Sequence, residues 1–143
     1  GCKGSNRDPL SEFSEVLVAS LTGGERAKSR TQKGWDIELD DGSHIEVKYL
    51  ANPEEGTWPN EHIVKMIERT QYYALVVYLD LYPRAVHVFP MDKLGEIFDI
   101  LGKQHEGKGE VLNIGRLAHE KLMEGQEELH RIGVTSIELP RKS

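Results

Sequence analysis

Hydrophobic residues near the start of the chain recur at helical spacing and predict an α-helix. Asp8-Pro9 or Ser11 can begin this helix, because a side-chain oxygen can cap the first turn and proline fits the first helical position. Gly23-Gly24 can end it. The apolar stripe of the predicted helix consists of Leu10, Phe13, Leu17 and Leu21. Glu15 lies opposite this stripe, on the side where solvent is expected.

Alternation of apolar and polar residues replaces the helical spacing from residue 35 to residue 50 and predicts a β-hairpin. Its turn is Asp40-Asp41-Gly42, because a glycine in the third position suits the left-handed conformation of a three-residue loop. With that loop, Ile37 lies opposite Ile45, and both side chains point into the core. A two-residue turn would instead mix the apolar and polar faces.

The rest of the chain shows predicted helices and strands with no internal repeat and no linker. The expected elements are a helix at 61–71, strands at 72–81 and 85–89, helices at 91–101 and 116–132, and a strand at 135–139. This order predicts a mixed α/β sheet flanked by helices, with a helical C-terminal part. It indicates a single domain, divided into a flexible tail at 1–9, a core at 10–90 and a C-terminal extension at 91–143.

Composition narrows the class of protein without changing the predicted fold. A length of 143 residues suits one domain, and no apolar run approaches the ~20 residues that span a bilayer. Because that run is missing, no membrane partner is expected. Cys2 is the only cysteine, so a reducing, cytoplasmic setting is expected, with no internal disulfide and no cysteine zinc site. The formal net charge of −6 weakens nonspecific coating of DNA but allows a local basic groove.

Polar residues of the predicted hairpin form a candidate catalytic group. The register that pairs the two isoleucines also places Asp36 opposite Glu46, with their Cβ atoms ~5 Å apart, and puts Lys48 on the same face. Two facing carboxylates repel each other unless a cation lies between them. Hard oxygen ligands suit Mg²⁺, for which Mn²⁺ is expected to substitute, and such a site predicts metal-assisted hydrolysis of phosphodiester bonds.

The spacing of Asp36, nine intervening residues and Glu46-Val47-Lys48 resembles the motif of the PD-(D/E)xK nucleases. The order of predicted elements over about residues 11–89 is similar to the restriction-endonuclease-like core of that superfamily. Within it, the approach Lys33-Gly34-Trp35-Asp36 resembles archaeal Holliday-junction resolvases and small restriction endonucleases. Trp35 stands where the usual motif has proline, a common variation that leaves the metal ligand in place.

The resemblance implies roles for these and further residues. The implied metal ligands are Asp36, Glu46 and the backbone carbonyl of Val47. Lys48 is implied as the catalytic cation. These families also place a glutamate of the first helix near the metal, which corresponds to Glu15 here, with Glu12 as the alternative. The implied activity is a restriction-like DNA endonuclease, and a Holliday-junction or repair nuclease is the closest alternative.

A basic window directly precedes the hairpin and is a candidate for binding DNA phosphates beside the cut. It contains Arg26, Lys28, Arg30 and Lys33. A solvated charged loop explains the same residues equally well. Because cutting two strands usually requires two sites, a homodimer is expected. Two interpretations without cleavage also remain open: a nuclease-like fold that only binds nucleic acid or a partner, and an unrelated protein in which the acids belong to a solvated hairpin face.

Overall fold

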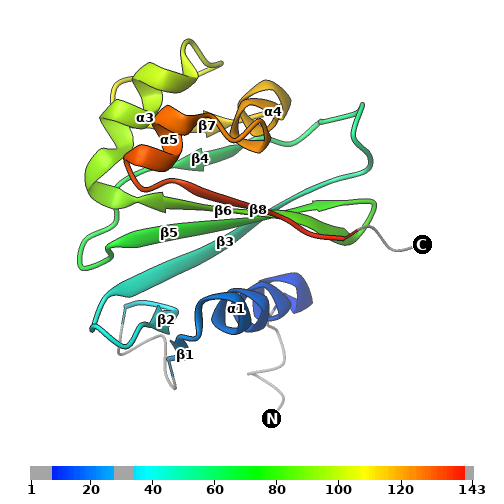
Figure 1. Ribbon diagram of the computed structural model, residues 1–143. Helices are drawn as coiled ribbons and strands as arrows, with labels where there is room; N and C mark the ends of the chain where they lie inside the picture. Colours follow the sequence, from blue (N-terminus) through cyan, green and yellow to red (C-terminus); the bar gives the residue numbers. More distant parts are fainter. Residues whose placement is uncertain (1–7, 28–33, 141–143) are drawn as a thin grey trace.

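The computed structural model describes residues 8–27 and 34–140, and a mixed six-stranded sheet forms its centre (Figure 1). The strands are β1 (Glu25–Arg26), β2 (Ile37–Glu38), β3 (His44–Asn52), β4 (His62–Val64), β5 (Tyr72–Leu79), β6 (Tyr82–Pro90), β7 (Leu112–Ile114) and β8 (Thr135–Glu138). The helices are α1 (Pro9–Thr22), the short 3-10 helix η2 (Met91–Lys93), α3 (Leu94–Leu101), α4 (Arg116–Met123) and α5 (Glu127–Arg131). The predicted mixed α/β architecture is confirmed.

The main sheet has the order β1-β2-β3-β5-β6-β8. Its β3 and β5 are parallel, whereas the other neighbouring pairs are antiparallel. Seven of the eight residues of β5 are buried, because β5 is central and covered on both faces. The strand β8 pairs with β6, so the segment predicted as a helical extension also completes one edge of the main sheet. A second, two-stranded sheet consists of β4 and β7.

The first helix begins and ends where its capping residues predict. The Asp8 side chain accepts a hydrogen bond from the Leu10 backbone N–H, and Gly23 has the left-handed conformation that ends the helix. The predicted apolar stripe is not the most buried side, because Phe13 and Leu21 are exposed. The buried residues of α1 are Ser14, Glu15 and Val18. Polar residues can occupy this side because they have partners there, as the 2.7 Å hydrogen bond between Ser14 Oγ and Tyr78 OH shows.

The hairpin has the predicted register. Ile37 of β2 pairs with Ile45 of β3, and both are buried. Gly42 has a φ of 87°, the left-handed conformation that the third loop position requires. The loop is closed by two hydrogen bonds: Leu39 N–H donates to the Ser43 carbonyl at 2.8 Å, and Gly42 N–H donates to the Leu39 carbonyl at 3.0 Å. Local turn chemistry therefore sets the alignment of the whole hairpin.

The connection between β3 and β5 is not the predicted helix. The prediction of a helix over 61–71 was wrong: the chain forms β4 and then a turn that includes Arg69 at a positive φ of 63°. The strand β4 pairs with β7, which the sequence pattern did not indicate. Val64 of β4 is fully buried, so tertiary pairing with a distant segment outweighs the local helical spacing.

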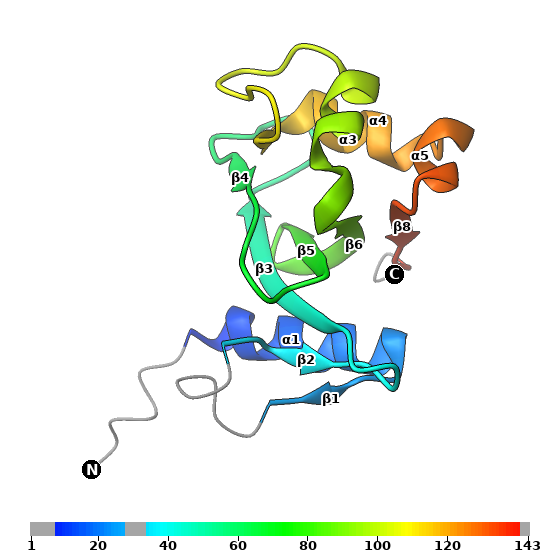
Figure 2. The ribbon, with the colours of Figure 1, turned by 90° about the vertical axis from the view of Figure 1, so that its left-hand side faces the viewer.

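Two hydrophobic clusters lie on opposite faces of the main sheet. Figure 2 shows α1 on one side of the sheet and α3, α4 and α5 on the other. One cluster packs Val18 of α1 against the sheet, and the larger cluster joins the sheet to α3, α4, β4 and β7. Gly125, with a φ of 70°, separates α4 from α5, so two helices occupy the range predicted as one helix over 116–132. None of the helices in residues 8–27 and 34–140 is long and apolar enough to cross a membrane.

Candidate active site

Alternation along β3 separates the candidate catalytic residues from the first helix. Ile45 and Val47 pack in the same cluster as Val18 of α1. Successive side chains of a strand point to opposite faces, so Glu46 and Lys48 point away from α1. This is the face on which the larger hydrophobic cluster and the small sheet of β4 and β7 lie.

Glu46 and Lys48 form an ion pair on this face. The distance from Lys48 Nζ to Glu46 Oε2 is 3.1 Å. The Glu46 side chain is only 15% exposed, whereas that of Lys48 is 50% exposed. The carboxylate is therefore shielded from bulk solvent, and the ammonium lies at the edge where a ligand can approach. The Lys48 ammonium therefore lies beside the Glu46 carboxylate, as the hairpin pattern predicts.

Asp36 lies beside the same stretch of β3, directly before β2 begins. Its backbone N–H donates to the Ile45 carbonyl at 3.2 Å, and its Oδ2 accepts from the Val47 N–H at 2.8 Å. The side chain therefore takes the place of a backbone acceptor where the pairing of β2 with β3 ends. Asp36 is buried, with 5% of its surface exposed. The Asp36 carboxylate is therefore largely shielded from solvent.

We expect Asp36→Ala to lower the free energy of unfolding by about 1–3 kcal/mol, because the buried Val47 N–H would lose its acceptor. Asp36→Asn keeps an acceptor oxygen of similar reach and should lose less. Urea denaturation of both variants in EDTA measures the difference. Equal stability of the alanine variant and the unmodified protein would show that the hydrogen bond does not stabilise the hairpin.

Two residues that the sequence did not single out complete this face. Tyr73 of β5 pairs in register with Glu46, and its hydroxyl shares a 2.6 Å hydrogen bond with His62 Nε2. Burial, together with the nearby charge of Lys48, lowers the pKa of His62 to about 4. Burial and the charge of Glu46 raise the pKa of Tyr73. At neutral pH both side chains are therefore uncharged.

These two neighbours could not be found from local sequence. The prediction put His62 in a helix, so its approach to β5 was hidden. The pairing of Tyr73 with Glu46 requires the parallel register of β3 and β5, which no local turn determines. The apolar run over 72–81 indicates only that residue 73 belongs to a strand.

Glu15 is held on the other face of the sheet. It is buried, and its Oε1 lies 3.2 Å from Nη2 of Arg26 in β1. A buried carboxylate requires such a partner. The structure therefore joins Glu15 to Arg26 and does not bring it to the face of Glu46 and Lys48. Glu12, the alternative residue, is exposed on α1.

The predicted basic window is described only at its first residue. Arg26 is part of the buried ion pair with Glu15, and a third of its side-chain surface is exposed. The remaining members lie outside the described residues: Lys28, Arg30 and Lys33.

The donor set for a metal is made of hard oxygens. Asp36 lies beside the part of β3 that carries the Glu46 side chain and the backbone of Val47. Carboxylate and carbonyl oxygens, completed by water and phosphate oxygens, fit Mg²⁺ better than a soft metal. In the part of the chain that the structure describes, no three His, Cys, Asp or Glu side chains form a group that could hold a metal by themselves.

No family model matches the sequence, and no curated protein matches it. The functional interpretation therefore depends on the register of the hairpin, on burial and on charge.

Proposed function

We propose that the chain is a metal-dependent DNA endonuclease with a restriction-endonuclease-like core. The observation that carries the proposal is the register of β2 and β3, because it brings Asp36 to the part of β3 that holds Glu46 and Lys48. If these residues only formed a solvated hairpin face, Asp36 would not need to lie beside Glu46 and Lys48. The buried carboxylate of Asp36 and the shielded carboxylate of Glu46 favour a site over a solvated surface.

In this proposal each residue has one task. Asp36, Glu46 and the carbonyl of Val47 would hold Mg²⁺, or Mn²⁺ in its place. The bound cation supplies charge neutralisation at the scissile phosphate. Lys48 orients the attacking water and stabilises the negative charge that develops on the phosphate, because its ammonium is half exposed and is held by Glu46. Tyr73 and His62, both uncharged, limit the access of water to Glu46 from the side of β4.

The substrate and the assembly follow from the same proposal. DNA is the proposed substrate, with restriction-like cleavage of duplex DNA as the main activity and cleavage of branched DNA as the alternative. A homodimer would supply the two sites that two strands require. Since the net charge is −6, binding must depend on local cations and should weaken as salt is added.

The proposal is tested with three DNA substrates: a supercoiled plasmid, a linear duplex and a four-way junction. Each is incubated with the purified protein in Mg²⁺, in Mn²⁺ and in EDTA, and the products are separated on denaturing gels. We expect cleavage in either metal and none in EDTA. Preference for the junction would indicate the recombination or repair role. Binding of all three substrates without cleavage in either metal would overturn the proposed activity.

A further inference from the structure

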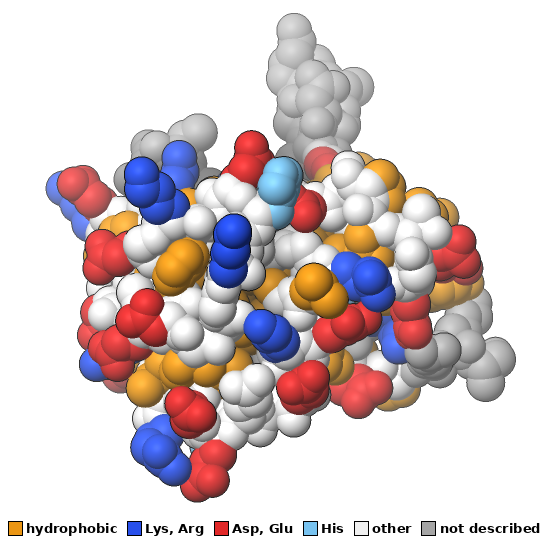
Figure 3. Space-filling view, turned by 90° about the horizontal axis from the view of Figure 1, so that it is seen from above, with side chains coloured by type: hydrophobic (Ala, Val, Ile, Leu, Met, Phe, Trp, Pro, Cys, Tyr) orange, Lys and Arg blue, Asp and Glu red, His pale blue; other side chains and the backbone are white. Residues whose placement is uncertain are grey.

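A polar cavity lies on the side of the sheet covered by the C-terminal helices. Its volume is about 330 Å³, and it lies between the β4 and β7 sheet, the segment after α3 and the first turn of α4. Figure 3 views the molecule from this side and shows cationic and acidic side chains interspersed with apolar ones. The charged groups that line the cavity are Lys103, Arg116, Lys121, Glu61 and the titratable His105. Three cations therefore face one carboxylate.

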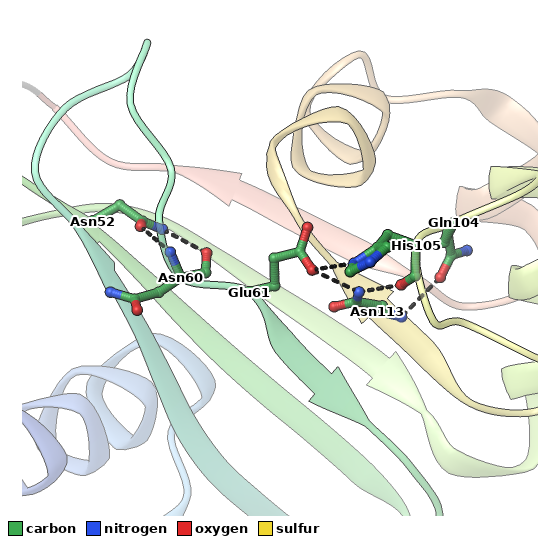
Figure 4. A network of polar contacts seen from close by, with 6 residues as sticks. All are labelled: Asn52, Asn60, Glu61, Gln104, His105 and Asn113. Carbon is green, nitrogen blue, oxygen red and sulfur yellow. Dashed lines mark hydrogen bonds and ion pairs between the residues drawn. The ribbon is translucent and has the colours of Figure 1, made fainter.

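A hydrogen-bonded network fixes one wall of the cavity (Figure 4). Glu61 Oε1 accepts from Asn113 Nδ2 at 2.8 Å and lies 3.0 Å from His105 Nδ1. The Gln104 side chain accepts from the Asn113 backbone N–H at 2.8 Å. The hydrogen bond to Glu61 raises the pKa of His105, and the hydrogen bonds from His105 and Asn113 lower that of Glu61. The negative charge of Glu61 is thus largely satisfied within the wall.

Two buried polar atoms of the cavity residues have no hydrogen-bond partner within the described residues. They are Nε1 of Trp58 and Oδ1 of Asn113. Asn113 is 97% buried, since only 3% of its surface is exposed. An unsatisfied buried donor or acceptor is costly, and a bound ligand is one way to satisfy it. Both atoms are closed to solvent, so a ligand can reach them only if the wall of the cavity shifts.

The cations are suited to an anion with several oxygens. Arg116 is 48% exposed, and its only ion pair within the described chain is the 3.4 Å contact with Glu120. The Lys121 ammonium donates to the Leu101 carbonyl at 2.6 Å and retains other protons for a ligand. The first turn of α4, from Gly115 to Ala118, also lines the cavity and has no side-chain cap. Its backbone N–H groups add to the positive potential there.

We propose that this cavity binds a phosphate monoester, with the phosphate held by Arg116, Lys103 and Lys121. The residues differ from those of the nuclease site, so the inference does not depend on the proposed cleavage. Two sources have this chemistry: a small phosphorylated metabolite and the phosphorylated end of a nucleic acid. The guanidinium of Arg116 is the main expected anchor, because it can contact two phosphate oxygens.

Isothermal titration calorimetry in EDTA tests the inference while any metal-dependent cleavage is prevented. The probes are inorganic phosphate, a 5′-phosphorylated oligonucleotide and the same oligonucleotide without the phosphate. We expect phosphate to bind, and Arg116→Ala to weaken binding at least tenfold, which corresponds to about 1.4 kcal/mol. Lys65→Ala is the matched control, since Lys65 is exposed and does not line the cavity. Tighter binding of the phosphorylated oligonucleotide than of its twin would identify the nucleic-acid end as the source.

A second variant separates loss of the site from loss of folding. A Cβ at Gly115 would lie 2.7 Å from Glu61 Oε2, so Gly115→Ala displaces the carboxylate that orients His105. The flexible end of Glu61 can move, and we expect the fold to be retained and phosphate binding to be weakened. Absence of binding by every probe, or equal affinities of Arg116→Ala and Lys65→Ala, would overturn the inference. DNA cleavage in the substrate panel would be unaffected by either result.

Discussion

Replacing Lys48 with methionine is expected to reduce Mg²⁺-dependent DNA cleavage by about 10²-fold or more, the size of effect seen when one preorganised electrostatic group is removed. Methionine keeps much of the aliphatic length of lysine and removes only the charge. Because half of the Lys48 side chain is exposed, we expect the free energy of unfolding to change by less than about 1 kcal/mol. Rates of plasmid nicking and urea denaturation measure the two quantities.

The matched control for this variant is Lys65→Met. Lys65 is an exposed lysine immediately after β4, and the same substitution there should leave both cleavage and stability unchanged. Both proteins are purified in parallel, so a contaminating nuclease would give equal activity in the two preparations. Full activity of Lys48→Met at unchanged stability would remove Lys48 from the catalytic group. Loss of activity together with loss of folding would show that the ion pair is structural.

The parts of the fold that the sequence predicted are those that local chemistry determines. The hairpin register follows from Asp40-Asp41-Gly42 and the alternation on either side, and the caps of α1 follow from Asp8 and Gly23. Each depends on residues within a few positions of one another. The prediction that Asp36 lies near Glu46 and Lys48 therefore required no knowledge of the rest of the chain.

The parts that the sequence did not predict depend on distant segments. The strand β4 exists because it pairs with β7, about fifty residues later in the chain, and its short length gives little periodic signal. Glu15 is buried because Arg26 of β1 reaches it, although the helical wheel places Glu15 opposite the apolar stripe. Burial of a charged residue cannot be inferred until its partner is placed.

His87 of β6 is fully buried and pairs with Leu75, a member of the larger hydrophobic cluster. His87 of β6 lies 2.8 Å from Ser136 Oγ through Nδ1 and 2.9 Å from His119 Nδ1 through Nε2. Burial, with a smaller contribution from His119, lowers the pKa of His87 to about 3. Burial also lowers the pKa of His119. Near neutral pH both rings are uncharged, and one chain of hydrogen bonds connects β8, β6 and α4.

This arrangement predicts a loss of stability in mild acid. The pKa of His87 in the folded protein lies below its usual value of 6.5, so the unfolded chain binds the proton more tightly. The stabilisation from the uncharged ring is complete above about pH 6.5 and is lost as the pH falls toward the folded-state value. His62, whose pKa is lowered to about 4, changes stability in the same direction. Each histidine should contribute up to about 1.4 kcal/mol per pH unit.

Urea denaturation between about pH 7 and pH 5 tests this expectation, since most carboxylates remain ionised in that interval. His87→Gln should be less stable than the unmodified protein at pH 7, because the packing of the ring is lost, but its stability should fall less steeply with decreasing pH. The slope separates titration of His87 from a simple packing defect, which would lower stability equally at each pH. His130→Gln is the control, because His130 is exposed and should leave the slope unchanged. Equal slopes for His87→Gln and the unmodified protein would mean that folding does not lower the pKa of His87. The buried hydrogen-bond chain would then have to accommodate a charged ring.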